Sequence, residues 1–236
     1  MGEAEGKVAL LAGGSGLAGS HLLTALLAAP DFVRVYAVTR RSLGREHARL
    51  ANRIVQFERL ESQLKGLACH TAFCCLGAPF GGAGRAEAAR RIDFDYVLAF
   101  ARAAKAAHAQ RFVFLSCVGA DSDARSARLR AKSEAEEALE ALSFPSLDIL
   151  QPGPLFGMRR EMPLSELTRS LAVLIATPFL FGPREAYRAI SARTVGAAML
   201  GAARSGRRGV YRYTNAGIKA LALSPTPRAL RRGAAS

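Results

Sequence analysis

The sequence predicts an α/β fold built on a doubly wound parallel sheet, and three observations support this prediction. Short apolar runs alternate with segments of helical spacing, a pattern typical of parallel strands covered by helices on both faces. A glycine-rich turn, residues 13–19, separates the first such run from the first helix. The chain has 236 residues, half of them hydrophobic, which is enough for one domain with a full core. We expect that domain to span residues 1–222.

The individual elements follow from apolar periodicity and from turn residues. Residues 7–12, "KVALLA", form an apolar run that ends at the glycines, and residues 17–29 then show helical spacing closed by Pro30. Further strands are predicted at 33–39, 53–57, 70–77, 111–116 and 147–153, and further helices at about 86–107 and 126–142.

The pattern loosens after Pro152. Residues 154–204 contain two predicted helices joined around "YRAIS", and we expect them to form a small C-terminal substrate-binding region, or lid, over the carboxyl edge of the sheet. A late strand is predicted at 209–214. Residues 223–236 are rich in Pro, Arg and small residues without periodicity, so we expect a disordered tail there.

The most apolar stretch lies at residues 171–182. It is interrupted by Pro178 and is too short to span a bilayer. We therefore expect a core helix, or one that contacts a second copy in a homodimer, and no membrane span.

The formal net charge of +14 comes mainly from arginines spread between Arg34 and Arg232. So large a basic excess favours an anionic partner, which could be a phosphate-bearing cofactor, nucleic acid or an acidic membrane surface. The simpler alternative is that arginine serves as the general surface cation. Nucleic acid is disfavoured as a partner, because no nucleic-acid-binding motif is present and the arginines are not interleaved with stacking aromatics.

The four cysteines, Cys69, Cys74, Cys75 and Cys117, are expected to be reduced and buried. Residues 1–6, "MGEAEG", lack the charged and then apolar order of a signal peptide, so we expect a cytoplasmic protein. Adjacent side chains on a strand point to opposite faces, which makes Cys74 and Cys75 a poor shared metal site. No bound metal is expected.

The turn has the spacing G-x-x-G-x-x-G, formed by Gly13, Gly16 and Gly19. The first glycine allows a tight turn off the strand, the second lets the backbone approach a pyrophosphate, and the third lets the helix pack close to the sheet. Because the glycines lie between a strand and a helix, we predict a nucleotide site that also includes Ser15 and Leu17. The alternative is a purely structural turn.

Arg40 and Arg41 end the second predicted strand, about twenty residues beyond the glycines. A site for NAD would have an acidic residue there, to accept hydrogen bonds from the ribose 2′-hydroxyl. A guanidinium instead matches a 2′-phosphate in charge and in geometry. We therefore predict NADP as the cofactor, against the alternative of two solvated arginines.

The segments "VTRR", "HTAFCCLGAP", "DFDYVL", "LSCVGAD" and "AKSEAEEALEAL" follow the glycine turn in order. With them the chain resembles the atypical short-chain dehydrogenases/reductases, and within these the Tat-interacting-protein-like oxidoreductases, from about residue 6 to about residue 205. The resemblance implies a Rossmann-type domain that binds NADP and reduces a carbonyl or oxidises a hydroxyl group of an unknown small molecule. It also places Leu76, Gly77 and the stretch from Pro152 to Leu155 along the cofactor.

The reductases of that superfamily use a serine, a Tyr-x-x-x-Lys pair and often an asparagine. The resemblance places Ser116 at the serine, Lys132 at the lysine and Asp93 at the asparagine. Ser116 would then orient a carbonyl, and Lys132 would hold the nicotinamide ribose. Arg128 stands where the tyrosine would be.

Arg128 cannot act as the general acid, because a guanidinium effectively never deprotonates. It could stabilise an oxyanion only electrostatically. We expect weak carbonyl reduction, or none, unless Tyr96 or Tyr187 substitutes. The alternative function is a sensor or scaffold that binds NADP and is catalytically silent.

The run "KSEAEEALE" after Lys132 reads as a solvated helix face that carries Glu134, Glu136 and Glu137. A hydrolytic pair of Ser116 and Lys132 is disfavoured, because no strained nucleophile turn or triad accompanies it.

Overall fold

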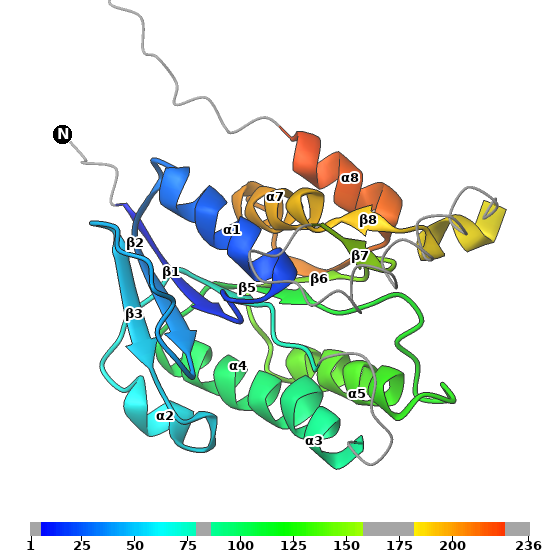
Figure 1. Ribbon diagram of the computed structural model, residues 1–236, viewed down its shortest axis with the longest axis horizontal. Coiled ribbons are helices and arrows are strands. Elements are labelled where there is room, and N and C mark those ends of the chain that lie inside the picture. Colours follow the sequence, from blue (N-terminus) through cyan, green and yellow to red (C-terminus); the bar gives the residue numbers. More distant parts are fainter. Residues whose placement is uncertain (1–5, 79–85, 158–181, 225–236) are drawn as a thin grey trace, which may run out of the picture.

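The computed structural model describes residues 6–78, 86–157 and 182–224. Its main sheet has seven parallel strands in the order β3-β2-β1-β4-β5-β6-β9 (Figure 1). The order reverses between β1 and β4, which are hydrogen-bonded neighbours, so the carboxyl ends of these two strands form the switch point where α/β sheets bind ligands. The strands are β1 (Lys7–Ala12), β2 (Phe32–Thr39), β3 (Leu50–Ile54), β4 (Thr71–Cys74), β5 (Arg111–Leu115), β6 (Ser146–Leu150) and β9 (Gly209–Tyr213).

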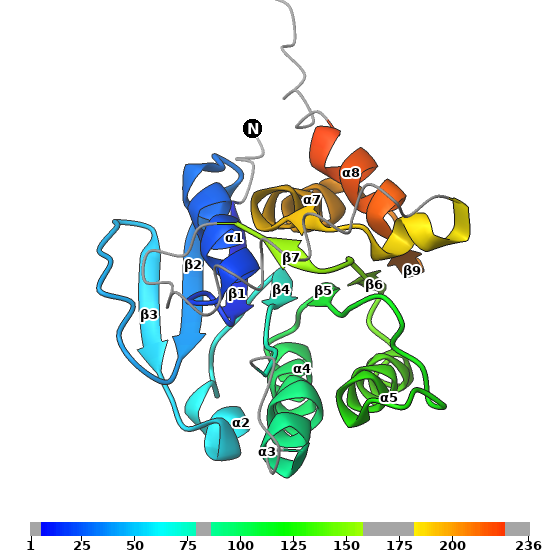
Figure 2. The ribbon, with the colours of Figure 1, turned by 45° about the vertical axis from the view of Figure 1, so that its right-hand side comes forward.

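Helices cover both faces of the sheet, as Figure 2 shows with the strands between them. One layer consists of α1 (Leu17–Ala28), α7 (Ala192–Arg204) and α8 (Asn215–Leu223), and the other of α2 (Leu60–Gln63), α3 (Ala86–Arg90), α4 (Tyr96–Ala106) and α5 (Ala127–Ala141). Because side chains alternate along a strand, Ala9 and Leu11 of β1 face the first layer while Leu10 and Ala12 face the second. The predicted doubly wound parallel α/β sheet is therefore confirmed.

Most predicted elements lie within a few residues of their predicted bounds. Strand β3 is shifted toward the N-terminus relative to the prediction at 53–57, because Phe57 begins a short 3₁₀ helix, η1 (Phe57–Arg59), and its ring packs 5.1 Å from that of Tyr96. Strand β4 ends at Cys74 and not at residue 77. The chain from Cys75 onward forms the loop at the carboxyl edge.

The helix predicted over residues 86–107 contains one π-helical segment, Arg91–Asp95, between α3 and α4. Segments of this kind often mark functional sites, since the wider turn redirects side chains. Here it carries the completely buried Asp93.

The C-terminal region differs most from the prediction. Residues 155–191 include a two-stranded parallel sheet of β7 (Leu155–Phe156) and β8 (Ile190–Ser191), with a 3₁₀ helix, η4 (Gly182–Tyr187), before β8. Of the two helices expected in 154–204, α7 is observed, whereas residues 171–181 of the other lie outside the described residues. Helix α8 was not predicted, and the predicted tail beyond Ser224 also lies outside them.

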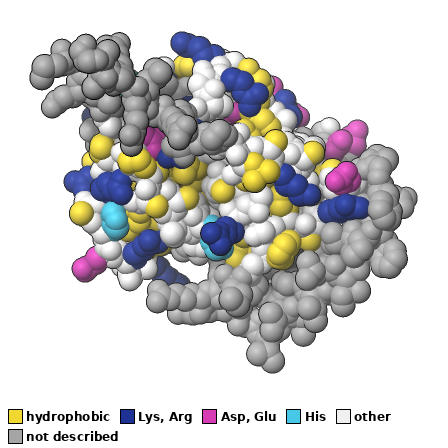
Figure 3. All heavy atoms as spheres, turned by 90° about the horizontal axis from the view of Figure 1, so that it is seen from above, with side chains coloured by type: hydrophobic (Ala, Val, Ile, Leu, Met, Phe, Trp, Pro, Cys, Tyr) yellow, Lys and Arg dark blue, Asp and Glu magenta, His cyan; other side chains and the backbone are white. Residues whose placement is uncertain are grey.

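Basic side chains are scattered over the one face that Figure 3 shows. Figure 3 looks onto the face above α1, α7 and α8, where Lys and Arg side chains stand apart from one another among apolar and uncharged atoms. None of the described helices is both long enough and apolar enough to cross a membrane.

Candidate functional site

The glycine turn lies at the switch point and needs its glycines for steric reasons. Gly13 has a φ of +79°, and a Cβ added to it would lie 2.5 Å from the carbonyl oxygen of Cys75, at the end of β4. A Cβ on Gly19 would lie 2.1 Å from the carbonyl oxygen of Gly13. Gly16 closes the turn by donating a 2.9 Å hydrogen bond to that same oxygen. The strand, turn and helix that the spacing predicts are therefore confirmed.

The start of α1 fits an anionic ligand. Gly16, at the N-cap, is extended and offers no side chain to cap the helix, and the first turn contains no acidic residue. The amide groups of that turn are thus left to an anion, which the helix dipole also favours. Ser15 is exposed beside them, and Leu17 is half-buried.

The segment after β6 passes close to this turn. A Cβ on Gly157 would lie 3.7 Å from Cδ1 of Leu17. Pro152 is buried and Leu155 half-buried in the same segment, as the end of β6 leads into β7. Residues from the ends of β1, β4 and β6 thus surround one edge, and their backbone cradle fits a dinucleotide.

Arg40 and Arg41 are both exposed immediately after β2. Their turn is held by Asn52 of β3, whose amide nitrogen donates a 2.6 Å hydrogen bond to Oγ1 of Thr39 and whose amide oxygen accepts a 2.9 Å bond from the backbone N–H of Leu43. Asn52 is a positioning residue that the sequence did not reveal, because its partners lie nine and thirteen residues away.

Tyr96 does not join the other predicted catalytic side chains. Its hydroxyl donates a hydrogen bond to Glu58, which follows β3. This bond raises the pKa of Tyr96 and lowers that of Glu58, and the charges of Arg91 and Arg40 lower the pKa of Glu58 further. The hydroxyl proton of Tyr96 therefore lies in the hydrogen bond to Glu58 and does not face the other predicted catalytic residues.

Asp93, Lys132 and Arg128 come together at the carboxyl ends of β4 and β5. The completely buried Asp93 carboxylate lies 3.2 Å from Nζ of Lys132 and 3.4 Å from Nε of Arg128, and Oδ1 also accepts a 3.3 Å bond from the N–H of Ala78. A Cβ on Gly77 would lie 3.5 Å from the Arg128 guanidinium. The structure thus places Arg128 beside Lys132, as their spacing of four along α5 predicts.

The three donors of the Lys132 ammonium are all engaged. They face the carbonyl oxygens of Leu76 and Leu115, at 2.9 and 3.4 Å, and the carboxylate of Asp93. Lys132 therefore ties the ends of β4 and β5 to the π-helical segment. To hold a nicotinamide ribose it would have to exchange one of these contacts.

Ser116 is hydrogen-bonded to Glu136, which was wrongly predicted to lie on a solvated helix face. Its hydroxyl donates a 2.5 Å hydrogen bond to Glu136, which also accepts two 2.9 Å bonds from the side-chain amide of Gln151 and lies 3.3 Å from Nε of Arg212. Glu136 is only 5% exposed, so it does not belong to a solvated helix face. The available signal was its spacing, since Arg128, Lys132 and Glu136 repeat every four residues and share one face of α5.

Tyr187 lies against the loop that follows β5. A Cβ on Gly119 would be 3.4 Å from its hydroxyl oxygen, and the Tyr187 side chain is half-exposed. Its segment is fixed by Asn215 at the start of α8, which accepts a 3.1 Å bond from the N–H of Gly153 and donates a 2.7 Å bond to the carbonyl oxygen of Arg188. Of the two predicted substitute tyrosines, Tyr187 is thus the one on the β5 side of the sheet.

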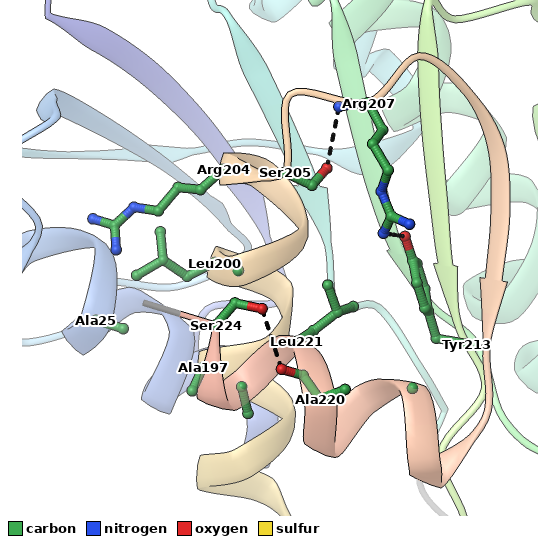
Figure 4. Close-up of a pocket in the computed structure, with 13 residues that line it drawn as sticks. Ala25, Ala197, Leu200, Arg204, Ser205, Arg207, Tyr213, Ala220, Leu221 and Ser224 are labelled. Atoms are coloured by element: carbon green, nitrogen blue, oxygen red, sulfur yellow. Dashed lines mark hydrogen bonds between the residues drawn. The ribbon is translucent and has the colours of Figure 1, made fainter. Parts of the chain in front are cut away.

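A hollow of about 710 Å³ lies elsewhere, between α1, α7, α8 and β9 (Figure 4). Two of the residues that line it are basic. Arg207 donates a 2.6 Å bond to the hydroxyl of Tyr213, and Arg204 on α7 pairs with Asp31, which does not line the hollow. None of the predicted site residues lines it.

Metal-binding groups are not evident in the described part of the chain, where no set of three or more His, Cys, Asp or Glu side chains could hold an ion. The four cysteines are unpaired, and burial raises the pKa of each thiol, to about 12 for Cys69 and about 11 for Cys74.

Comparison with known proteins supplies further findings. The model of the NAD dependent epimerase/dehydratase family matches residues 9–140. Protein HTATIP2 of Rattus norvegicus is 35% identical over 161 residues, which cover 66% of this chain and 66% of that protein. Protein FMP52, mitochondrial, of Saccharomyces cerevisiae is 32% identical over 171 residues, which cover 71% of this chain and 74% of that protein.

Solved structures share the fold. A short chain dehydrogenase from Burkholderia cenocepacia in complex with NADP has a TM-score of 0.65 and 19% identity, over 94% of this chain and 93% of that one. MoeE5 in complex with UDP-glucose and NAD has a TM-score of 0.65 and 20% identity, over 88% of this chain and 75% of that one.

Proposed function

The chain belongs to the NAD dependent epimerase/dehydratase family, and on that premise we propose that it binds NADP and acts as an oxidoreductase on a carbonyl or hydroxyl group of a small molecule. The predicted resemblance to the Tat-interacting-protein-like branch of the atypical short-chain dehydrogenases/reductases is confirmed by the match to rat HTATIP2. The observation that carries the proposal is the glycine turn, which leads into an uncapped helix at the switch point of the sheet.

Each part of the dinucleotide has a proposed partner. The amides around Gly13, Gly16 and Gly19 would hold the pyrophosphate, and Arg40 with Arg41 would hold the 2′-phosphate. Leu76 and Gly77, Pro152 and Leu155 would line its other half. When bound, the nucleotide supplies or accepts a hydride.

Charge placement tests nucleotide binding. Ser15 is exposed in the turn, so Ser15→Asp puts a carboxylate at the proposed pyrophosphate site without disturbing the core. We expect NADPH affinity, measured by calorimetry, to fall by at least about tenfold in Ser15→Asp, because like charges repel there. The matched variant Ser15→Asn, of the same shape but uncharged, should retain it. Equal affinity in all three proteins, or no binding by the wild type, would contradict the proposal.

A second candidate function is nucleotide binding without turnover. The observation that favours it is that the hydroxyl of Ser116 and the ammonium of Lys132 are both engaged within the protein, while Arg128 replaces the expected proton donor. A positioned general acid contributes about 10² to 10⁴ in rate. NADPH oxidation over a panel of aldehydes and ketones separates the two functions. Turnover by the wild type supports the oxidoreductase, whereas tight binding with turnover gained only in Arg128→Tyr supports the silent binder.

A further inference from the structure

Arg128 places a permanent positive charge at the ends of β4 and β5. Its guanidinium shares the Asp93 carboxylate with Lys132, whose side chain is 3% exposed, and is itself only 20% exposed. A tyrosine in its place would be neutral at physiological pH, since its pKa is near 10. Charges that are so little exposed act on their neighbours through a lower effective dielectric constant than charges in water do.

The neighbouring acidic groups on α5 have partners of their own. Glu136 pairs with Arg212 of β9, which also pairs with the more exposed Glu140. Glu134 pairs with Arg90 at the surface. Burial raises the pKa of the nearby Cys117 thiol, which therefore stays neutral. The Asp93 carboxylate offsets one of the two positive charges that it contacts. Among the described residues, Asp93, Lys132 and Arg128 together therefore keep one positive charge, which is lost when Arg128 is replaced by a neutral residue.

The topology relates this charge to one half of the proposed ligand. A dinucleotide that crosses the switch point lies with one half over β1, β2 and β3 and the other over β4 and β5. Arg40, proposed for the 2′-phosphate of the adenosine half, follows β2. The nicotinamide half is then the one beside Gly77 and Arg128. A Cβ added to Gly77 would lie 3.5 Å from the Arg128 guanidinium, so these two residues are in contact range.

We propose that Arg128 makes this site selective for NADPH over NADP⁺, an inference that rests on the proposed binding of NADP. The phosphates are the same in the two nucleotides, whereas the nicotinamide ring is a cation only in the oxidised form. Arg128 therefore repels the ring of NADP⁺ and not that of NADPH. The two forms of the nucleotide are told apart by their charge.

The experiment compares dissociation constants for NADPH and NADP⁺, with NADPH binding measured by its fluorescence and NADP⁺ binding by calorimetry. The wild type should bind NADPH more tightly by on the order of tenfold. Arg128→Gln should bring the ratio close to one, chiefly through tighter binding of NADP⁺. Arg128→Lys, which keeps the charge, should retain most of the preference.

Arg130→Gln is the matched control. Arg130 lies on the same helix, and its guanidinium donates bonds of 2.6 and 3.1 Å to the carbonyl oxygens of Ala124 and Arg125. In Arg130→Gln, the ratio of the dissociation constants for NADPH and NADP⁺ should equal that of the wild type. Equal affinities for the two nucleotides in the wild type would overturn the inference, as would a preference that persists in Arg128→Gln. If neither nucleotide binds the wild type, the proposed function itself has failed.

Discussion

Glu136 on α5 accepts a 2.5 Å hydrogen bond from Ser116, and both residues are 5% exposed. The carboxylate also takes both 2.9 Å bonds from Gln151 and pairs with Arg212. It therefore joins the ends of β5 and β6 and the edge strand β9 to one helix. The single proton of the Ser116 hydroxyl points toward Glu136 in this network.

Removal of this carboxylate should destabilise the protein. Glu136→Ala leaves the buried hydroxyl of Ser116 and the half-buried amide of Gln151 without this acceptor, and we expect the free energy of unfolding to fall by about 1–3 kcal/mol. Urea denaturation at pH 7 measures the change. Glu134→Ala on the same helix is the control, because it removes only a partly exposed pair with Arg90 and should cost less than about 1 kcal/mol. Equal losses in the two variants would show that the network contributes nothing specific.

Arg40 should set the preference between NADPH and NADH. We expect Arg40→Ala to weaken NADPH binding by about tenfold or more, because a charge-assisted bond to the 2′-phosphate is lost, and to leave NADH binding nearly unchanged. Calorimetric titration with both nucleotides measures this. Arg53→Ala serves as control, since Arg53 is exposed on β3 and lies over the ring of Tyr36. A preference that is unaltered in Arg40→Ala would count against the 2′-phosphate assignment.

Asn52 should support the same preference indirectly. Asn52→Ala removes the side chain that holds Thr39 and the N–H of Leu43, so the turn between them becomes less ordered. We expect a smaller loss of NADPH affinity than in Arg40→Ala, with no effect on NADH. A loss of affinity for both nucleotides alike would point to a general structural defect.

Local patterns predicted the features that depend on neighbours in the chain. The glycine turn, the register of Arg128 with Lys132 and most strands are encoded within short segments, and the structure places them accordingly. The burial of Glu136 was indicated only by its spacing of four from Lys132, whereas its pairing with Arg212, which lies 76 residues away, could not be predicted. Helix α8 was missed for the same kind of reason, since its buried face packs on α7.

The cysteines should react slowly in the folded protein. Burial raises the pKa of Cys74 to about 11, so at pH 8 only about one thiol in a thousand is ionised, and the thiolate is the reactive species. We expect Ellman's reagent to label the native protein slowly and all four thiols quickly in urea. Cys75 and Cys117 are the two partly buried cysteines, and burial raises the pKa of the Cys75 thiol more strongly, so most of the residual native reaction should be lost in Cys117→Ser. Rapid labelling of several thiols in the native protein would contradict this prediction.

The free energy of unfolding should depend on pH through an ion pair between Asp31, just before β2, and Arg204, at the end of α7. Burial raises the pKa of Asp31, but the hydrogen bond and the charge of Arg204 outweigh this, so the pKa lies below the ordinary carboxyl value. A lowered folded-state pKa stabilises the protein above the unfolded-state pKa, and this stability is lost as the pH falls through the folded value. The pair should therefore contribute at neutral pH and stop contributing in strong acid.

A double-mutant cycle measures that contribution. Asp31→Asn, Arg204→Ala and the double variant are unfolded in urea at pH 7 and at about pH 2. We expect a coupling energy of about 1 kcal/mol at pH 7, modest because Asp31 is partly exposed, and close to zero in acid. Loss of the ion pair should lower the stability of each single variant only at the higher pH. Arg204→Ala also loses the apolar contacts of the arginine stem at both pH values, and the cycle subtracts this part. A coupling energy that is the same at both pH values would mean that packing, and not the ionised carboxylate, joins β2 to α7.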